Sequence, residues 1–122
     1  MKSNSFSVKA RGKSFQYALQ GIYKFFLQEP NAVIHLIATI LAFLAAFYFD
    51  ITKTEMIVLV MVTGFVWTAE LFNTAIEKIM DFISPDRHPV IAFIKDVSAG
   101  AVLLSALIAF ITGIIIFLPK IL

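Results

Sequence analysis

Three long apolar stretches constrain the fold of this chain more than any other feature of its sequence. They cover residues 32–49, 56–69 and 97–118, and none of them contains Asp, Glu, Lys or Arg. About 18 consecutive apolar residues suffice for a helix to cross a bilayer. Because 60% of the 122 residues are hydrophobic, the chain has too little polar surface for a soluble domain of this size. The sequence therefore predicts an all-α integral membrane protein with three transmembrane helices.

The middle stretch is shorter than the other two, but it continues beyond Glu70 with apolar residues on several helical faces. Leu71, Ile76 and Ile79 are among the residues that extend it. A membrane helix over residues 56–80, reaching into the cytoplasm, is therefore expected.

The segment before the first span has a different pattern. In residues 14–28, large apolar side chains recur at helical spacing, whereas Gln16, Gln20 and Lys24 lie on other sides. The apolar positions are Phe15, Ala18, Leu19, Ile22, Phe25 and Phe26. This pattern predicts an amphipathic helix that lies in the membrane interface. Residues 1–122 are interpreted as one domain, in which this surface helix precedes membrane helices over 32–49, 56–80 and 97–118.

Polar or proline-containing connections separate the expected helices. Thr52 and Glu55 have the spacing of a capping box, so the second membrane helix is expected to begin at about residue 53. The segment SPDRHP, residues 84–89, contains two prolines and is expected to break the chain between the second and third spans. Pro119 is expected to end the third span.

The distribution of basic residues predicts the orientation in the membrane. Five basic residues precede the first span, one lies in the first loop, three lie near the second loop, and one follows the third span. In that order they are Lys2, Lys9, Arg11, Lys13 and Lys24; Lys53; Lys78, Arg87 and Lys95; and Lys120. Because cytoplasmic loops carry the excess of Lys and Arg, the N-terminus and residues 78–96 are expected in the cytoplasm. Residues 50–55 and the C-terminus are expected outside.

The second span ends in a stripe of polar residues. Glu70, Asn73, Glu77 and Asp81 share one helical face at about 100° per residue. If the helix enters the bilayer near Met56, Glu70 lies roughly 21 Å along it, at the inner edge of the hydrocarbon. A carboxylate at this depth is costly and requires a partner or a function. Asp81, and less readily Glu77, fits a solvated helix end with nearby basic partners.

Two chemical roles suit such a stripe. Oxygen ligands one or two turns apart suit a divalent cation such as Mg²⁺, and a deeper carboxylate suits a general base. Further polar residues at the same expected membrane face are Glu29, Asn31, His35, Lys95 and Asp96. The opposite face has only Asp50, Lys53, Glu55 and Lys120. This asymmetry indicates one cytoplasmic-face site that receives one reactant from water and another from lipid.

Two other features are interpreted mainly as packing. His35 is interpreted as a packed imidazole, with a ligand role as the alternative. The small residues of the third span are interpreted as a helix-packing seam. They are Ser98, Ala101, Ser105, Ala109 and Thr112. A net charge of +2 without a basic-aromatic motif gives no indication of nucleic-acid binding.

A resemblance to a known family rests on three segments. They are ELFNTAIEKIMD (residues 70–81), IKDVSAGAVLL (94–104) and FQYALQGIYKFFLQEPN (15–31). With these segments, and with a surface helix followed by three spans, the chain resembles the small bacterial integral-membrane lipid kinases, namely diacylglycerol kinase and the related undecaprenol kinase. The resemblance implies a homotrimer in the plasma (inner) membrane. It also implies that ATP and Mg²⁺ are used to phosphorylate the hydroxyl of a membrane lipid alcohol.

The resemblance further implies roles for individual residues. Glu70 would be the base that acts on the lipid hydroxyl, and Asn73 would orient the groups beside it. Glu29 and Glu77 would hold the metal and contact the nucleotide. The remaining nucleotide contacts would be Tyr17, Asp86, Arg87, His88, Lys95 and Asp96. The loop over 84–89 differs from the family's more usual sequences, and His35 stands where some members carry an acid.

Alternatives remain open at this point. The acceptor is undecaprenol or diacylglycerol, and the segments VSAGAVLL and ITGIIIFLPKIL are more similar to the undecaprenol kinase branch. A small proton- or cation-coupled membrane carrier that uses Glu70 and Glu77 is the alternative from another class. A noncatalytic membrane assembly subunit is a third interpretation.

Overall fold

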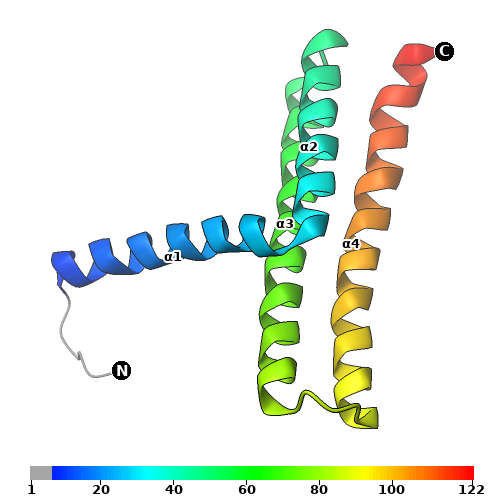
Figure 1. Ribbon diagram of the computed structural model, residues 1–122. Coiled ribbons are helices and arrows are strands. Elements are labelled where there is room, and N and C mark those ends of the chain that lie inside the picture. Colours follow the sequence, from blue (N-terminus) through cyan, green and yellow to red (C-terminus); the bar gives the residue numbers. More distant parts are fainter. Residues whose placement is uncertain (1–6) are drawn as a thin grey trace.

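The computed structural model describes residues 7–122, which form four α-helices and contain no β-strand. The helices are α1 (Val8–Gln28), α2 (Pro30–Tyr48), α3 (Lys53–Ile83) and α4 (Pro89–Ile121). Helices α2, α3 and α4 run alongside one another, whereas α1 runs crosswise to them (Figure 1). These three are long and apolar enough to cross a membrane. The expected all-helical chain with three apolar spans is confirmed.

The ends of the helices differ from those expected at several places. Helix α1 begins at Val8 rather than at residue 14, because the Ser7 side chain accepts a hydrogen bond from the amide of Ala10 (3.3 Å) and caps the first turn. The expectation that Pro119 ends the last helix is wrong, since α4 continues to Ile121. Pro119 lacks the N–H that would bond to the preceding turn and its ring crowds a carbonyl there, but so close to the helix end few backbone bonds are affected. Lys2, counted above for the orientation, lies outside the described residues.

The turn between α2 and α3 explains why α3 begins where the sequence predicts. Backbone bonds from Asp50 to Phe47 (3.3 Å) and from Ile51 to Ala46 (3.2 Å) close α2 in the pattern of a Schellman motif. Asp50 takes the positive φ of 50° that this motif requires, a conformation that Asp tolerates better than most residues. The predicted capping box is then formed, with Thr52 and Glu55 bonded reciprocally at 3.1 and 2.9 Å.

The break after α3 also follows the prolines. Helix α3 ends at Ile83, and Pro89 occupies the first turn of α4, where a missing N–H costs nothing. His88 precedes it as the N-cap, and its Nδ1 accepts a bond from the amide of Val90 (3.1 Å). Helices α3 and α4 are therefore longer than the expected spans 56–80 and 97–118. They approach the 84–89 segment from both sides.

A small core joins the three long helices at one end of the bundle. Ala46, Leu59 and Ile116 are buried together, and Phe43 and Phe117 pack against them. Beyond this core, Lys120 and Glu55 form an ion pair of 3.0 Å between α4 and α3. Helices α2, α3 and α4 alternate in direction, so α1 and the start of α2 meet the bundle partway along α3, and the end of α3 and the start of α4 extend beyond them (Figure 1).

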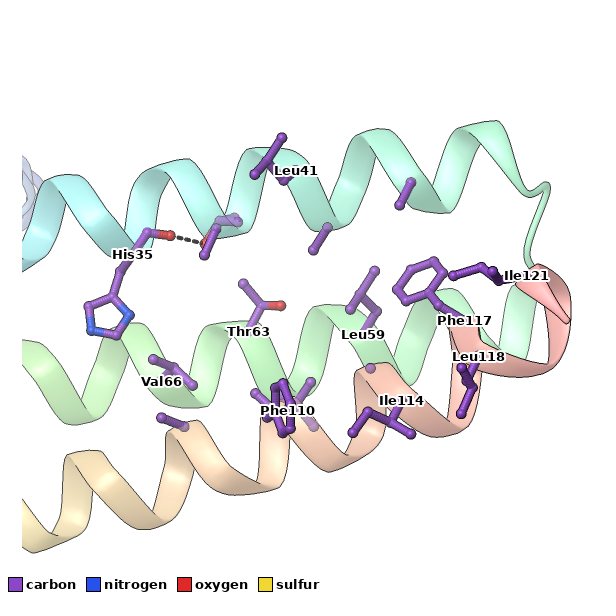
Figure 2. A pocket seen from close by; sticks show the side chains of 18 residues that line it. His35, Leu41, Leu59, Thr63, Val66, Phe110, Ile114, Phe117, Leu118 and Ile121 are labelled. Atoms are coloured by element: carbon purple, nitrogen blue, oxygen red, sulfur yellow. Dashed lines mark hydrogen bonds between the residues drawn. The ribbon is translucent and has the colours of Figure 1, made fainter.

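Most apolar side chains on the three spans point outward. Leu41, Phe110 and Ile115 are 60%, 66% and 68% exposed. An apolar groove of about 640 Å³ runs between α2, α3 and α4, with His35 at one end of it (Figure 2). Soluble monomers rarely expose such continuous apolar surface, whereas a bilayer covers it without cost. The surface of the bundle is thus that of a membrane protein.

Candidate active site

Glu70 is the buried carboxylate around which the site is arranged. Although it lies in the middle of α3, only 3% of its surface is exposed. Its Oε1 lies 2.6 Å from Nε2 of His35, which comes from the second turn of α2. Figure 2 shows the imidazole pointing from α2 toward α3. The partner that a carboxylate at this depth requires is therefore a histidine on the neighbouring helix.

The imidazole of His35 is itself held in place by Trp67. The two rings pack edge to face, with centroids 6.1 Å apart. Trp67 Nε1 donates to Thr39 Oγ1 (3.0 Å), and this hydroxyl donates to the carbonyl oxygen of His35 (2.7 Å). Trp67 also packs against Phe25 and Phe26 of α1, with centroids 6.2 and 5.3 Å apart. His35 is thus packed, as expected, and also contacts the carboxylate of Glu70, which the sequence did not indicate.

A second carboxylate, Glu77, is held by a chain of hydrogen bonds that crosses from α4 to α3. Ser98 Oγ donates to Asn73 Oδ1 (2.7 Å), and Asn73 Nδ2 donates to Glu77 Oε1 (2.9 Å). Because Ser98 fixes which end of the amide accepts, the other end must donate to the carboxylate. Asn73 therefore orients Glu77, while Ser98, interpreted above only as part of a packing seam, orients Asn73.

The third carboxylate, Glu29, forms the joint between α1 and α2. It is the C-cap of α1 and the N-cap of α2. Its Oε2 accepts a hydrogen bond from Thr74 Oγ1 (3.4 Å). Thr74 lies one turn before Glu77, about 4.5 Å along α3. Glu29 therefore contacts α3 about one turn before Glu77. Within residues 7–122 no group of three or more His, Cys, Asp or Glu is arranged so that it could hold a metal ion.

Lys95 and Asp96 lie in the second turn of α4, beside the end of α3. Lys95 Nζ forms an ion pair of 2.5 Å with Asp81 Oδ1, and both side chains are accessible to water. The interpretation of Asp81 as a solvated helix end with a basic partner agrees with this geometry, although its partner comes from α4. Asp96 is exposed on the same turn.

Four of the expected nucleotide contacts lie apart from the carboxylates within one chain. Tyr17 is 64% exposed, and twelve residues of α1, roughly 18 Å of helix, separate it from Glu29. The loop with Asp86, Arg87 and His88 follows Ile83, and it lies roughly 14 Å beyond Thr74 along α3. These residues extend the polar end of the molecule without touching Glu70 or Glu77.

Thr74 and Ser98 belong to the site although the sequence analysis assigned them no part in it. A signal for Thr74 was present, because Glu70, Thr74 and Glu77 lie at i, i+4 and i+7 of one helix and so share a face. For Ser98, the signal was its position one turn after Lys95. The polar residues thus form separate pairs and one three-residue chain of hydrogen bonds along the second half of α3, at the edge of the apolar spans.

Comparison with known proteins shows the family of this chain. Residues 16–117 match the family model of prokaryotic diacylglycerol kinase. The chain belongs to this family. It is therefore a lipid kinase of the membrane, for which ATP is the expected phosphoryl donor. This membership sets aside the carrier and the noncatalytic subunit as interpretations.

Individual relatives support the same family. The chain is 36% identical over 108 residues to the undecaprenol kinase of Bacillus subtilis (strain 168), covering 88% of each protein. It is 34% identical over 110 residues to the diacylglycerol kinase of Synechocystis sp., covering 89% of this chain and 63% of that relative. It is 28% identical over 109 residues to the diacylglycerol kinase of Escherichia coli (strain K12), covering 89% and 86% of the two chains.

Proposed function

We propose that this kinase transfers the γ-phosphoryl group of ATP to the hydroxyl of a membrane lipid alcohol, with Glu70 as the general base. The observation that carries this proposal is the burial of Glu70 beside a polar cluster at the edge of the apolar spans. In the reaction, the acceptor oxygen gives its proton to Glu70 and forms a bond to the γ-phosphorus. The bond from that phosphorus to the β–γ bridging oxygen breaks, and ADP leaves with the electron pair.

The proposed depth of the site follows from the lengths of the helices. Helix α3 has 31 residues, or about 46 Å, which exceeds the roughly 30 Å of bilayer hydrocarbon. Helix α1 runs crosswise at the level of Glu29, and Phe15, Leu19 and Ile22 on it are exposed. We infer that these apolar side chains embed α1 in the cytoplasmic interface. Glu70 then lies about one turn inside the hydrocarbon, where a lipid hydroxyl reaches it without leaving the bilayer.

Glu29 and Glu77 would hold the Mg²⁺ of the reaction. The donor set fits this ion, because Mg²⁺ usually takes one or two carboxylates and completes its shell with phosphate oxygens and water. When bound, it neutralises charge on the phosphates. Asn73 and Ser98 keep the carboxylate of Glu77 oriented. In the proposed reaction, Lys95 exchanges its partner Asp81 for a phosphate, while Asp96 on the same turn contacts the nucleotide.

The family resemblance also supports a homotrimer. The outward apolar side chains of α2, α3 and α4 offer the surface that such an assembly would partly cover. We propose that Tyr17 and the residues of the 86–88 loop contact the nucleotide, as the family resemblance implies, although within one chain they lie apart from Glu77.

The acceptor is proposed to be undecaprenol rather than diacylglycerol. The support for this choice is the 36% identity to an undecaprenol kinase, against 34% and 28% to two diacylglycerol kinases. Purified protein in mixed micelles with labelled ATP and Mg²⁺ tests it, when undecaprenol, diacylglycerol and a short-chain alcohol are supplied in turn. Faster labelling of diacylglycerol than of undecaprenol would reverse the choice, and no labelling of any lipid would defeat the proposed function.

The base is tested by Glu70→Gln, which keeps the shape of the side chain and removes its basicity. Loss of a general base lowers turnover by ~10²–10⁴-fold, and the mass of the assembly in detergent should not change. Glu55→Gln, at the opposite end of the bundle, is the matched control and should keep nearly the full rate. If Glu70→Gln retains more than about a third of the wild-type rate, Glu70 is not the base.

A further inference from the structure

The contact between His35 and Glu70 has no role in the reaction as described so far. We propose that His35 is the positioning residue for Glu70, and that it holds Oε1 so that Oε2 is the oxygen that takes the acceptor's proton. This inference rests on the proposed function, in which Glu70 is the base. It rests on the 2.6 Å separation of Nε2 and Oε1 and on the surroundings of both side chains.

The short separation requires a proton between the two atoms. A ring nitrogen and a carboxylate oxygen that both present lone pairs repel each other at this distance, whereas a shared proton makes the contact attractive. For Glu70 to act as a base, the facing Nε2 of His35 must carry a proton. The resulting ion pair holds Oε1 against the imidazole and restricts rotation of the carboxylate about its last bond.

The second oxygen of the carboxylate is left for the acceptor. Glu70 Oε2 makes no hydrogen bond with any residue in the described range, 7–122. The two oxygens of Glu70 thus differ, because Oε1 faces Nε2 of His35 and Oε2 has no partner among the described residues.

The imidazole is suited to this task because it is immobilised. Trp67 packs against it in a T-shaped arrangement, and Thr39 links Trp67 to the backbone of His35 through two hydrogen bonds. His35 also lines the end of the apolar groove between α2, α3 and α4 (Figure 2). A base held from this side is aimed at the boundary between the apolar spans and the polar end of the bundle, where the hydroxyl of a lipid acceptor would be.

The experiment compares His35→Leu with His35→Gln in the micelle assay. Leucine removes every donor, whereas the amide nitrogen of glutamine can take the position of Nε2 and donate to Oε1 without carrying charge. Since small misplacements of a reacting group cost up to about 100-fold, we expect His35→Leu to lower kcat by about 10- to 100-fold. The KM values for ATP and lipid should stay within about threefold, and His35→Gln should recover most of the lost kcat.

A double variant separates positioning from a structural effect. If His35 acts through Glu70, then adding His35→Leu to Glu70→Gln should lower the rate no further. A further loss equal to that of the single His35→Leu variant would overturn the inference, as would an unchanged kcat in His35→Leu. Equal kcat values for His35→Gln and His35→Leu would overturn it too.

Two further comparisons separate the role of His35 from a failure of assembly and from a failure of the proposed function. If His35→Leu does not assemble with the wild-type mass, His35→Asn replaces it, since the amide of asparagine is too short to reach the position of Nε2. The positioning role then requires His35→Gln to exceed His35→Asn in kcat. A fully active Glu70→Gln variant would defeat the assignment of the base, whereas an inactive Glu70→Gln with a fully active His35→Leu would defeat only the role of His35.

Discussion

The three carboxylates of the site have different partners, and these partners suggest different tasks. Glu70 contacts an imidazole, Glu77 accepts from an amide, and Glu29 accepts from a hydroxyl. An imidazole can fix a buried base in one orientation. Neutral donors leave the full negative charge of Glu29 and Glu77 available to a cation.

This difference predicts that variants of Glu29 and Glu77 change the Mg²⁺ dependence of the reaction. Glu29→Gln and Glu77→Gln should each raise the Mg²⁺ concentration for half-maximal activity by about tenfold or more, because even the loss of a ligand's supporting partner costs ~10–100-fold in metal affinity. Titration of Mg²⁺ at fixed ATP measures this, and excess Mg²⁺ should restore the rate at best partly. Glu55→Gln should leave the titration unchanged. A wild-type titration curve in both site variants would remove the two carboxylates as the metal ligands.

Helix α3 is the element that connects the membrane to the site. It starts at a capping box and carries Glu70, Asn73 and Glu77 along one side. Its length allows it to leave the bilayer while it is still helical. The start of the helix lies roughly 26 Å along the axis from Glu70, so the stability of the helix and the activity of the site can be perturbed separately.

Two threonines near the start of α3 provide a matched test. Thr52→Ala removes the N-cap and should destabilise the protein by about 1 kcal/mol. Thr54→Ala, two residues later, removes a hydroxyl that makes no hydrogen bond with the described residues, and it should leave stability unchanged or slightly raised because alanine is the better helix former. Unfolding in mixed micelles with increasing SDS measures both variants, and both should keep the wild-type kcat. Equal stability of the two variants would contradict the capping role.

At the scale of the whole molecule, the two ends of the bundle differ in chemistry. One half contains the three carboxylates and the junction with α1, and it ends in the loop between α3 and α4 (Figure 1). The other has the Glu55–Lys120 ion pair and the short turn before α3. Since ATP is cytoplasmic, the proposed function requires the first end to face the cytoplasm, as the distribution of basic residues predicts.

Cysteine labelling of intact spheroplasts tests this orientation. A cysteine at Lys53, which is exposed, should react with an impermeant thiol reagent added outside, and one at Lys120 should react more slowly because that position is partly covered. Cysteines at Arg87 and Lys13 should react only after permeabilisation. The chain has no native cysteine, so the background is negligible. Labelling of the Arg87 position from outside would invert the topology and separate the site from its nucleotide.

The sequence by itself determined the helices and the end of the molecule at which the polar residues gather. Apolar length, the two prolines of the 84–89 segment and the Thr52–Glu55 pair act locally along the chain, so their consequences can be predicted without knowing how the helices pack. The stripe from Glu70 to Asp81 was predictable for the same reason, because the period of a helix fixes which residues share a face. The ends of α1 and α4 were not, since Ser7 caps a turn without apolar periodicity and Pro119 affects few backbone bonds so close to the helix end.

Only the tertiary structure decided how these side chains are paired. The contact of His35 with Glu70 depends on how α2 is rotated against α3, and the bond from Ser98 to Asn73 depends on the register of α4. Rotation and register are set by the packing of small and large side chains over whole helices, and in a membrane no solvent-facing polar face reveals them in the sequence. From the sequence, a histidine or serine on an apolar helix is therefore interpreted as a packing residue. Only the tertiary structure shows that the facing helix places a carboxylate or an amide in contact with it.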